Sequence, residues 1–214
     1  MNYLDRVDLF AGLDEAQTQS LVDRSRLRSF VASTVVVNEG DEGGSMYVVQ
    51  SGSLKAYLTD KTGREVTLSL LDEGDYFGEL ALLDDAPRSA SVAAVTRSEL
   101  LQVPRSAFLA LIEEHPASMQ VVIRNLVARI RALSDNVRSL ALEDVFRRVT
   151  RAFETLAVER DGQRLIERRL TQQDVASLVG ASREMVNRVL RDLVAGGYVE
   201  IEQHHIVLRR KLPT

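Results

Sequence analysis

The sequence LTQQDVASLVGASREMVNRVLRDL, residues 170–193, decides the fold of the C-terminal part of the chain. Thr171, followed three residues later by Asp174, is typical of a capping box at the start of a helix. Gly180 supplies a position where a positive φ is easily reached, and Ser182 is the expected N-cap of a second helix. Two helices joined by a short glycine turn form a helix-turn-helix.

The second of these helices has a polar face near its N-terminus, the part that enters the major groove in a DNA-bound helix-turn-helix. Arginine there can bond to both O6 and N7 of guanine, and glutamate can accept from cytosine N4. Hydroxyl and amide side chains at the helix starts can reach phosphates. The residues predicted to contact DNA are Thr171, Gln173, Ser182, Arg183, Glu184, Asn187 and Arg188. The alternative is a helical hairpin whose charges only form a solvated surface.

The segments on either side of the helix-turn-helix favour a winged DNA-binding domain. Residues 196–208, GGYVEIEQHHIVL, predict a two-stranded wing. Upstream, residues 143–157 have the apolar spacing of an amphipathic helix, and residues 158–164, VERDGQR, are expected to form a polar turn. We therefore predict a winged helix-turn-helix domain over residues 143–214.

A long helix is predicted immediately before this domain. Pro116 suits the first turn of a helix, and apolar residues then recur every three or four positions. They are Met119, Ile123, Leu126, Ile130, Leu133, Val137 and Leu140. This spacing is that of a coiled-coil seam, so residues 116–142 are predicted to form a central dimerisation helix. The alternative is a long helix that packs on its own β-domain.

The N-terminal part of the chain is rich in short β-forming runs between about residues 29 and 104. Examples are VVV at 35–37 and MYVVQ at 46–50, and turn signals such as NEGDEGG at 38–44 separate them. Many short strands at this spacing indicate a β-sandwich, jelly roll or barrel. The predicted class is α+β, with residues 1–115 as an N-terminal β-domain.

An anion-binding loop is predicted in GDYFGELALLDDAPRSASV, residues 74–92. Gly78 lets the backbone approach a ligand, and the short helix that follows would point its amides at an anion. Arg88 offers a bidentate fork for phosphate, and Ser89 adds a hydroxyl donor. Glu79 could accept hydrogen bonds from a ribose hydroxyl. The alternative is a structural loop in which Arg88 pairs with Glu79.

Both motifs resemble those of one family. FGELALL (77–83) with PRSASV (87–92) resembles the phosphate-binding cassette of the cyclic-AMP receptor protein (CRP/FNR) family. SREMVNRVL (182–190) resembles that family's recognition helix, and the resemblance runs in the same order from about residue 8 to 209. It implies a cyclic-nucleotide-binding β-roll (jelly roll) as the sensor, a homodimer, and a ligand-gated transcription regulator.

The resemblance also implies the residues and partners of each site. The ligand-binding residues would be Gly78, Glu79, Leu80, Arg88, Ser89, Ala90, Arg129, Leu133 and Ser134. Arg129 would support Glu79 from the central helix. Arg183, Glu184 and Arg188 would read a TGTGA-like half-site, repeated as an inverted pair, and the regulator would contact RNA polymerase.

Two positions depart from the family pattern. Leu133-Ser134 stands where cyclic-AMP-binding members carry Thr-Ser, and Met185 replaces a threonine that often touches phosphate. The effector therefore stays open at this point: cyclic AMP first, cyclic di-GMP as an alternative, or no small molecule, with DNA binding that is constitutive.

Composition excludes several classes of protein. The chain has no cysteine, and the only histidine before residue 143 is His115, so haem, an iron–sulfur cluster and a metal site are not expected. No catalytic motif is visible, so an enzyme is not expected. Residues 1–142 carry 14 Lys and Arg against 20 Asp and Glu, whereas residues 143–214 carry 13 against 11. Only the second part has the charge expected for DNA binding. Without a signal-peptide pattern or an apolar run of about 20 residues, we expect a cytoplasmic protein that does not enter the membrane.

Overall fold

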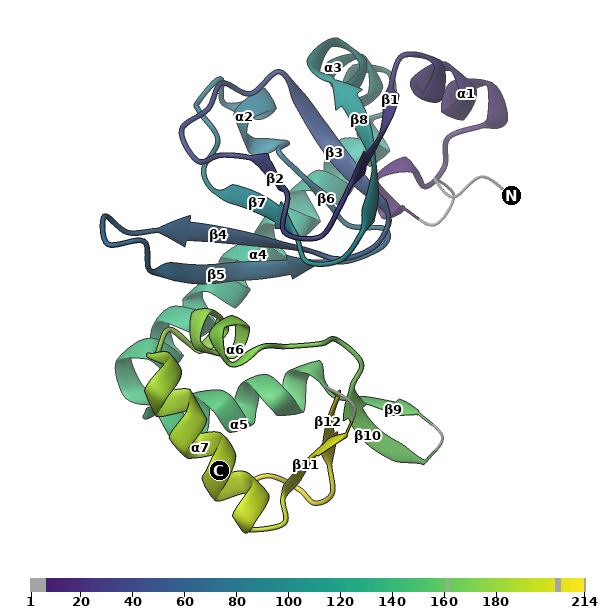
Figure 1. Cartoon of the computed structure of the whole chain (residues 1–214). Coiled ribbons are helices and arrows are strands. Elements are labelled where there is room, and N and C mark those ends of the chain that lie inside the picture. The colour runs from purple at the N-terminus through teal and green to yellow at the C-terminus, as the bar shows by residue number, and fades with distance from the viewer. Residues whose placement is uncertain (1–6, 161, 203–204, 214) are drawn as a thin grey trace. The chain divides into compact units, whose positions relative to one another are not determined.

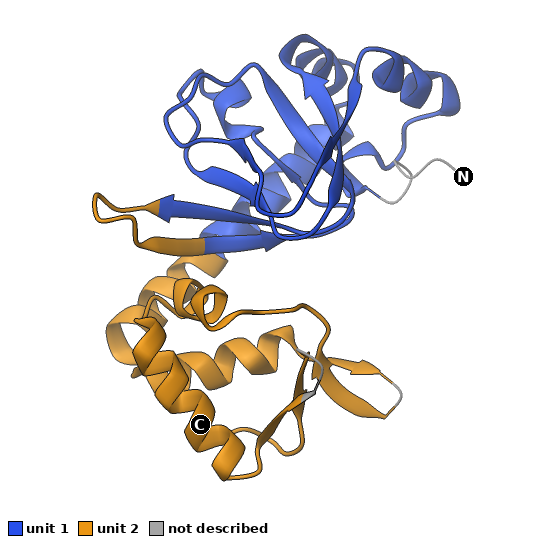
Figure 2. Cartoon of the chain, viewed as in Figure 1, with its two compact units in different colours: residues 1–58, 68–131 blue, residues 59–67, 132–214 orange. Residues whose placement is uncertain are grey.

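A computed structural model describes residues 7–160, 162–202 and 205–213 of the chain (Figure 1). The chain divides into two compact units (Figure 2). The first comprises residues 1–58 and 68–131, and the second comprises residues 59–67 and 132–214. The two units have separate buried cores.

The first unit contains two four-stranded sheets. Strand order is β1-β8-β3-β6 in one sheet and β2-β7-β4-β5 in the other, and β3 pairs antiparallel with both β8 and β6. The strands are β1 (Arg26–Phe30), β2 (Val35–Val37), β3 (Ser45–Ser51), β4 (Leu54–Thr59), β5 (Glu65–Leu71), β6 (Tyr76–Phe77), β7 (Ser91–Ala94) and β8 (Ser98–Pro104). This is the β-roll that the sequence predicted, and the α+β class is confirmed.

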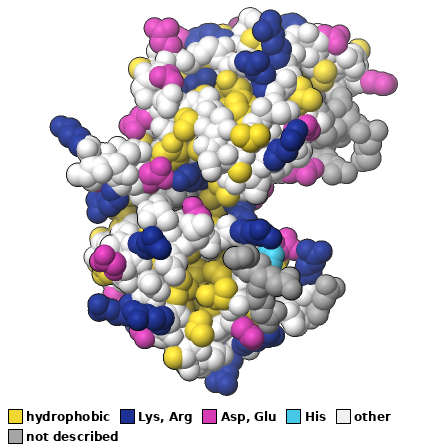
Figure 3. Space-filling model, in the orientation of Figure 1, with side chains coloured by type: hydrophobic (Ala, Val, Ile, Leu, Met, Phe, Trp, Pro, Cys, Tyr) yellow, Lys and Arg dark blue, Asp and Glu magenta, His cyan; other side chains and the backbone are white. Residues whose placement is uncertain are grey.

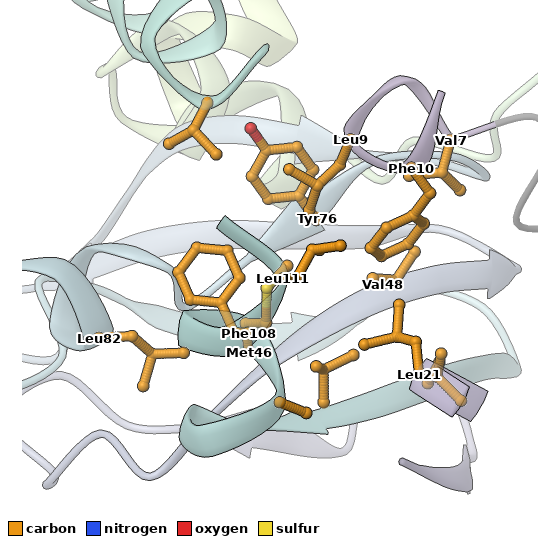
Figure 4. Close-up of a cluster of buried hydrophobic side chains, with 14 residues drawn as sticks. Val7, Leu9, Phe10, Leu21, Met46, Val48, Tyr76, Leu82, Phe108 and Leu111 are labelled. Atoms are coloured by element: carbon orange, nitrogen blue, oxygen red, sulfur yellow. The ribbon is translucent and has the colours of Figure 1, made fainter. Parts of the chain in front are cut away.

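Strand β3 is buried on both faces, which explains its unbroken apolar run. Tyr47 and Val49 join a core cluster with residues of both sheets, and the Tyr47 ring stacks on Phe77 with ring centroids 5.2 Å apart. Met46 and Val48 face the other way, because side chains alternate along a strand. They belong to a second cluster, shown in Figure 4.

Helices cover this second face of the β1-β8-β3-β6 sheet. The 3-10 helix η2 (Asp8–Phe10) and the α-helices α1 (Glu15–Asp23), α3 (Arg105–Glu114) and α4 (Pro116–Leu142) all contribute buried residues or partly buried neighbours to the cluster. Asp14 caps α1 through a capping box with Gln17. Phe108 of α3 is completely buried at the centre of this core (Figure 4).

The predicted seam on α4 needs a correction. Met119 and Leu126 are partly buried against the β-roll core, so the alternative of a helix packed on its own β-domain holds for the first part of α4. The remaining seam positions are exposed, with Ile130 at 63% and Val137 at 66%, and Val127 joins them. The exposed apolar stripe of α4 consists of Ile123, Val127, Ile130, Leu133, Val137 and Leu140.

Besides residues 59–67 and the end of α4, the second unit contains three further helices and one four-stranded sheet. The helices are α5 (Val145–Leu156), α6 (Gln172–Val179) and α7 (Arg183–Ala195), and the strands are β9 (Val158–Arg160), β10 (Gln163–Ile166), β11 (Val199–Glu202) and β12 (His205–Leu208). Strand order is β11-β12-β10-β9. Apolar residues of the helices and of β10, β11 and β12 share one core that includes Phe153 and Leu193.

Some elements differ from the sequence predictions. Where a polar turn was predicted at 158–164, β9 and β10 pair antiparallel, and residue 161 between them lies outside the described residues. Strands β1, β6 and β8 were not predicted. The two strands of the predicted wing, β11 and β12, pair antiparallel, and residues 203–204 between them lie outside the described residues. Residues 1–6 also lie outside them. Within the described ranges, no helix is long and apolar enough to cross a membrane.

Candidate ligand cradle and DNA-binding surface

The predicted anion-binding loop occupies the turn between β6 and the short helix α2 (Leu80–Leu83), together with the turn before β7. We call the residues 78–80 and 88–90 the cradle. Gly78 has φ +85°, and a Cβ at this position would collide with the guanidinium group of Arg88. Only glycine combines this backbone conformation with so close an approach of a side chain.

Arg88 is the cation of the cradle. Its Nη1 donates to the Gly78 carbonyl oxygen at 2.8 Å and its Nη2 donates to the Ser45 carbonyl oxygen at 2.6 Å. The side chain is 6% exposed, and within the described part of the chain its Nε has no hydrogen-bond partner. Burial lowers the pKa of the guanidinium, against the opposing effect of Tyr47 and two carboxylates. The charge of Arg88 is thus satisfied by neutral carbonyls, which a phosphate group could replace.

Glu79 is the anion of the cradle and is 1% exposed. Its Oε1 accepts from Arg129 Nη1 at 2.6 Å, so Glu79 forms its ion pair with the central helix. The alternative prediction, in which Arg88 pairs with Glu79, is therefore wrong. Its Oε2 is buried without a hydrogen-bond partner among the described residues. Burial raises the pKa of the Glu79 carboxyl, and the charge of Arg129 opposes this rise.

Arg129 also connects α4 to β6. Its Nη2 donates to the Tyr76 carbonyl oxygen at 2.6 Å, and its guanidinium lies over the Tyr76 ring at 5.6 Å from the centroid. Asn125, one helical turn earlier, donates from Nδ2 to the Tyr76 hydroxyl at 3.1 Å. The sequence analysis missed Asn125. Its spacing of four residues from Arg129, which places both on one face of the helix, is the signal that could have found it.

The other predicted ligand residues lie in two places. Leu80 begins α2, whereas Ser89 and Ala90 lie in the turn before β7, so these three belong to the cradle segments. Leu133 and Ser134 are exposed on the part of α4 that belongs to the second unit.

The helix-turn-helix has the local geometry that the sequence predicted. Thr171 Oγ1 accepts from the Asp174 amide at 3.1 Å, and the Asp174 carboxylate accepts from the Thr171 amide at 2.8 Å, which forms the capping box of α6. Gly180 ends α6 with φ +61°. The Ser182 hydroxyl accepts from the Met185 amide at 3.3 Å and caps α7.

Helix α7 separates its apolar and polar side chains. Val186, Val189, Leu190 and Leu193 are buried in the core of the second unit. The predicted base-reading residues Arg183, Glu184 and Arg188 are exposed, as are Thr171, Gln173 and Ser182 at the two helix starts. Lys and Arg side chains lie over the α7 region in Figure 3. This surface therefore presents cations and hydrogen-bonding groups together, as DNA recognition requires.

Asn187 differs from its neighbours because it is half-buried. Its Oδ1 accepts from Gln172 Nε2 at 3.4 Å, and Gln172 Oε1 accepts from Arg183 Nε at 3.4 Å. Gln172, at the start of α6, thus connects two predicted DNA contacts and was missed by the sequence analysis. Its role depends on how the two helices cross, which no short motif reveals.

Acidic and histidine side chains do not converge on a further centre in the described ranges. Over residues 7–160, 162–202 and 205–213, no group of three or more His, Asp or Glu side chains is arranged to hold a metal ion.

Two family profiles match the chain, one in each half. Residues 27–115 match the Cyclic nucleotide-binding domain, and residues 147–212 match the Crp-like helix-turn-helix domain.

Similar proteins cover nearly the whole chain. A CRP-like cAMP-activated global transcriptional regulator of Mycobacterium tuberculosis is 30% identical over 209 residues, which are 96% of this chain and 93% of that protein. The Cyclic AMP receptor protein of Thermus thermophilus is 34% identical over 90% of this chain and 88% of its own length. Among solved structures, the c-di-GMP responsive global regulator CLP of Xanthomonas campestris superposes with a TM-score of 0.79. It is 26% identical, with 91% of this chain and 99% of that chain covered.

Proposed function

This chain belongs to the CRP/FNR family of transcription regulators, and we propose that it is a homodimer gated by a cyclic nucleotide, with cyclic AMP as the first candidate. Family membership makes it a DNA-binding transcription regulator with a cyclic nucleotide-binding domain, and not an enzyme. We further propose that its DNA site is a TGTGA-like inverted repeat and that it acts through RNA polymerase.

The position of Arg88 is the observation that carries the ligand proposal. A buried guanidinium beside a left-handed glycine provides a fixed cation where a backbone can also donate to an anion. A cyclic phosphate would replace neutral carbonyl acceptors with charged ones, which strengthens each hydrogen bond. The relatives at 30% and 34% identity, whose names refer to cyclic AMP, favour cyclic AMP over other cyclic nucleotides.

The exposed apolar stripe of α4 supports the proposal of a dimer. Six large apolar side chains that follow a three-to-four spacing along one helix are unusual on a monomer, and a second copy of the helix would cover them. A two-fold axis along this seam would present two recognition helices to half-sites about 34 Å apart.

The ion pair between Glu79 and Arg129 supports a route from ligand to helix. A ribose hydroxyl could donate to the unpartnered Oε2 of Glu79 while Oε1 keeps its bond to Arg129, so the ligand would bind the same carboxylate that holds α4 and could change how α4 is held. Leu133 and Ser134, further along α4, remain predicted ligand contacts. The ligand would act on the helix pair, and the helix pair would set the spacing of the recognition helices.

Calorimetry with cyclic AMP and, separately, cyclic di-GMP tests the proposal, with DNA affinity measured by fluorescence anisotropy on a TGTGA palindrome. We expect cyclic AMP to bind at micromolar concentrations, to raise DNA affinity, and to lose both effects in Arg88→Ala. Binding of cyclic di-GMP alone would assign the effector named for the Xanthomonas protein instead. Ligand-independent DNA binding that Arg88→Ala leaves unchanged would favour a constitutive regulator.

A further inference from the structure

A cavity of about 590 Å³ lies in the first unit, next to the cradle but lined by other residues. Its walls come from β1, β2, β3 and β8 and from the segment that precedes β3. Of the predicted cradle residues, Arg88 alone lines it. The volume lies within the range of about 300–1,000 Å³ that is usual for small-molecule sites.

Three arginines line this cavity: Arg24, Arg26 and Arg88. Within the described part of the chain, no carboxylate lies within 4 Å of their side-chain nitrogens, although Asp41 and Glu42 also line the cavity. The Asp41 carboxylate instead accepts from Asn38 Nδ2 at 3.1 Å and from the Asn38 amide at 3.3 Å. Arg24 Nε donates to the Ser20 carbonyl oxygen at 3.3 Å, and Arg88 donates to two carbonyls. These two guanidinium groups are thus bonded to neutral acceptors, which an anionic ligand could replace.

Arg88 makes the cavity selective for acceptors. Arg88 is only 6% exposed, and its Nε donor has no partner among the described residues. Guanidinium groups only donate hydrogen bonds and stay charged at all ordinary pH values. A buried donor without an acceptor is destabilising, so a ligand that brings an anionic oxygen to this guanidinium group is favoured.

The rest of the wall indicates an organic ligand rather than a simple ion. The side chains of Val36 and Val37 and the ring of Tyr47 line the same space. We propose that this cavity binds a small organic anion that carries carboxylate or phosphate groups, and that this anion competes with the cradle ligand for Arg88. The competition rests on the proposed cyclic-nucleotide site, whereas the anion site itself does not.

Competition for one guanidinium has a definite consequence. The guanidinium group of Arg88 donates to Gly78 in the cradle, and the same side chain lines the cavity. One guanidinium group cannot form bidentate hydrogen bonds to an anion on each side at the same time. The organic anion then weakens binding of the cyclic nucleotide, and the cyclic nucleotide weakens binding of the anion by the same factor. The regulator would respond to the ratio of two metabolites.

The test uses citrate and phenyl phosphate as probes of the two anion chemistries, at constant ionic strength. Methyl signals of Val36 and Val37 are followed by NMR with each probe, and calorimetry measures cyclic AMP affinity with and without it. Arg26→Ala removes a cavity cation, and Arg28→Ala, on the same strand but outside the cavity, is the matched control. We expect saturable shifts with at least one probe, about tenfold weaker in Arg26→Ala and unchanged in Arg28→Ala.

Two results would overturn the inference. Absence of saturable shifts with both probes, or equal weakening in the two variants, rules out a built anion site. Probe binding that leaves cyclic AMP affinity unchanged rules out the shared use of Arg88. If the protein binds no cyclic nucleotide, the NMR titration still tests the anion site, so failure of the proposed function is distinguished from failure of this inference.

Discussion

Arg129 Nη1 on α4 lies 2.6 Å from Oε1 of Glu79, a carboxylate that is only 1% exposed, so the central helix neutralises the most deeply buried charge of the β-roll. The two residues are 50 positions apart in the chain. Removal of either partner acts on both the stability of the first unit and the attachment of α4 to β6.

Arg129→Ala leaves the Glu79 carboxylate buried without its cation. Loss of one partner of a fully buried pair costs about 3–5 kcal/mol. Because the Arg129 side chain is 37% exposed and water can partly replace it, we expect the free energy of unfolding to fall by about 2 kcal/mol. Urea denaturation measures this change. The double variant with Glu79→Gln should recover part of the loss, and strictly additive effects would show that the two residues do not interact.

Glu79 predicts a pH dependence of stability. Burial raises the pKa of its carboxyl in the folded state above the ordinary value of 4.5. Between that value and the raised pKa, the folded state binds more protons than the unfolded state, so this residue's contribution to stability falls as the pH rises through this window. The difference in free energy of unfolding between the wild type and Glu79→Gln, measured from pH 4.5 upward, should decrease and then level off. A difference that grows with pH would contradict the raised pKa.

Gly180→Ala tests the turn of the helix-turn-helix. Alanine at φ +61° loses about 1–2 kcal/mol from the left-handed conformation alone, and its Cβ would lie 2.7 Å from Leu140 Cδ2. Gly162→Ala is the control, because Gly162 has φ +74° with nothing within 4 Å of the added Cβ. Both variants should lower the free energy of unfolding, and Gly180→Ala should lower it more. Equal losses would mean that the Leu140 contact is relieved by small shifts.

Arg183→Ala and Gln172→Ala test the DNA surface. If Arg183 bonds to a base, its loss should weaken binding to the palindrome by about 1–3 kcal/mol and relax specificity at one position. Gln172→Ala should give a smaller loss, because Gln172 only positions Arg183 and Asn187. Anisotropy titrations at two salt concentrations measure both. Arg105→Ala, which removes an arginine of the first unit paired with Asp85, should leave DNA affinity unchanged.

Ile130→Asn tests the apolar stripe of α4. Ile130 is 63% exposed, and a polar side chain there should shift the proposed dimer toward monomer in sedimentation experiments at micromolar protein concentration. Ala128→Asn introduces the same residue about 160° away around the helix, and should leave the dimer intact. Equal behaviour of the two variants would place the dimer contact elsewhere.

Several features of this protein follow from the sequence alone because they are local. The capping box of Thr171 and Asp174, the left-handed Gly180 and the Ser182 cap each depend on hydrogen bonds or dihedral angles within a few residues. The β-roll was predictable from short apolar runs that turn signals separate. Strand β1 was not, because four of its five residues are exposed and no alternation remains, and β6 has only two residues.

Residue types and spacing did not decide which groups satisfy the buried charges. They offered Arg88 as a partner for Glu79, and only the family resemblance indicated Arg129; in the folded chain Arg129 reaches Glu79 from α4, and Arg88 donates to two carbonyls. Only the tertiary structure decided that Met119 and Leu126 pack on the β-roll instead of joining the exposed stripe. The spacing of apolar residues predicts the apolar face of a helix but not which surface packs against it. The partner of a buried charge is the group that lies near it in the folded chain, and this group can be far away in the sequence. Short-range geometry can therefore be predicted from the sequence, whereas the long-range pairing of charges and surfaces depends on the complete fold.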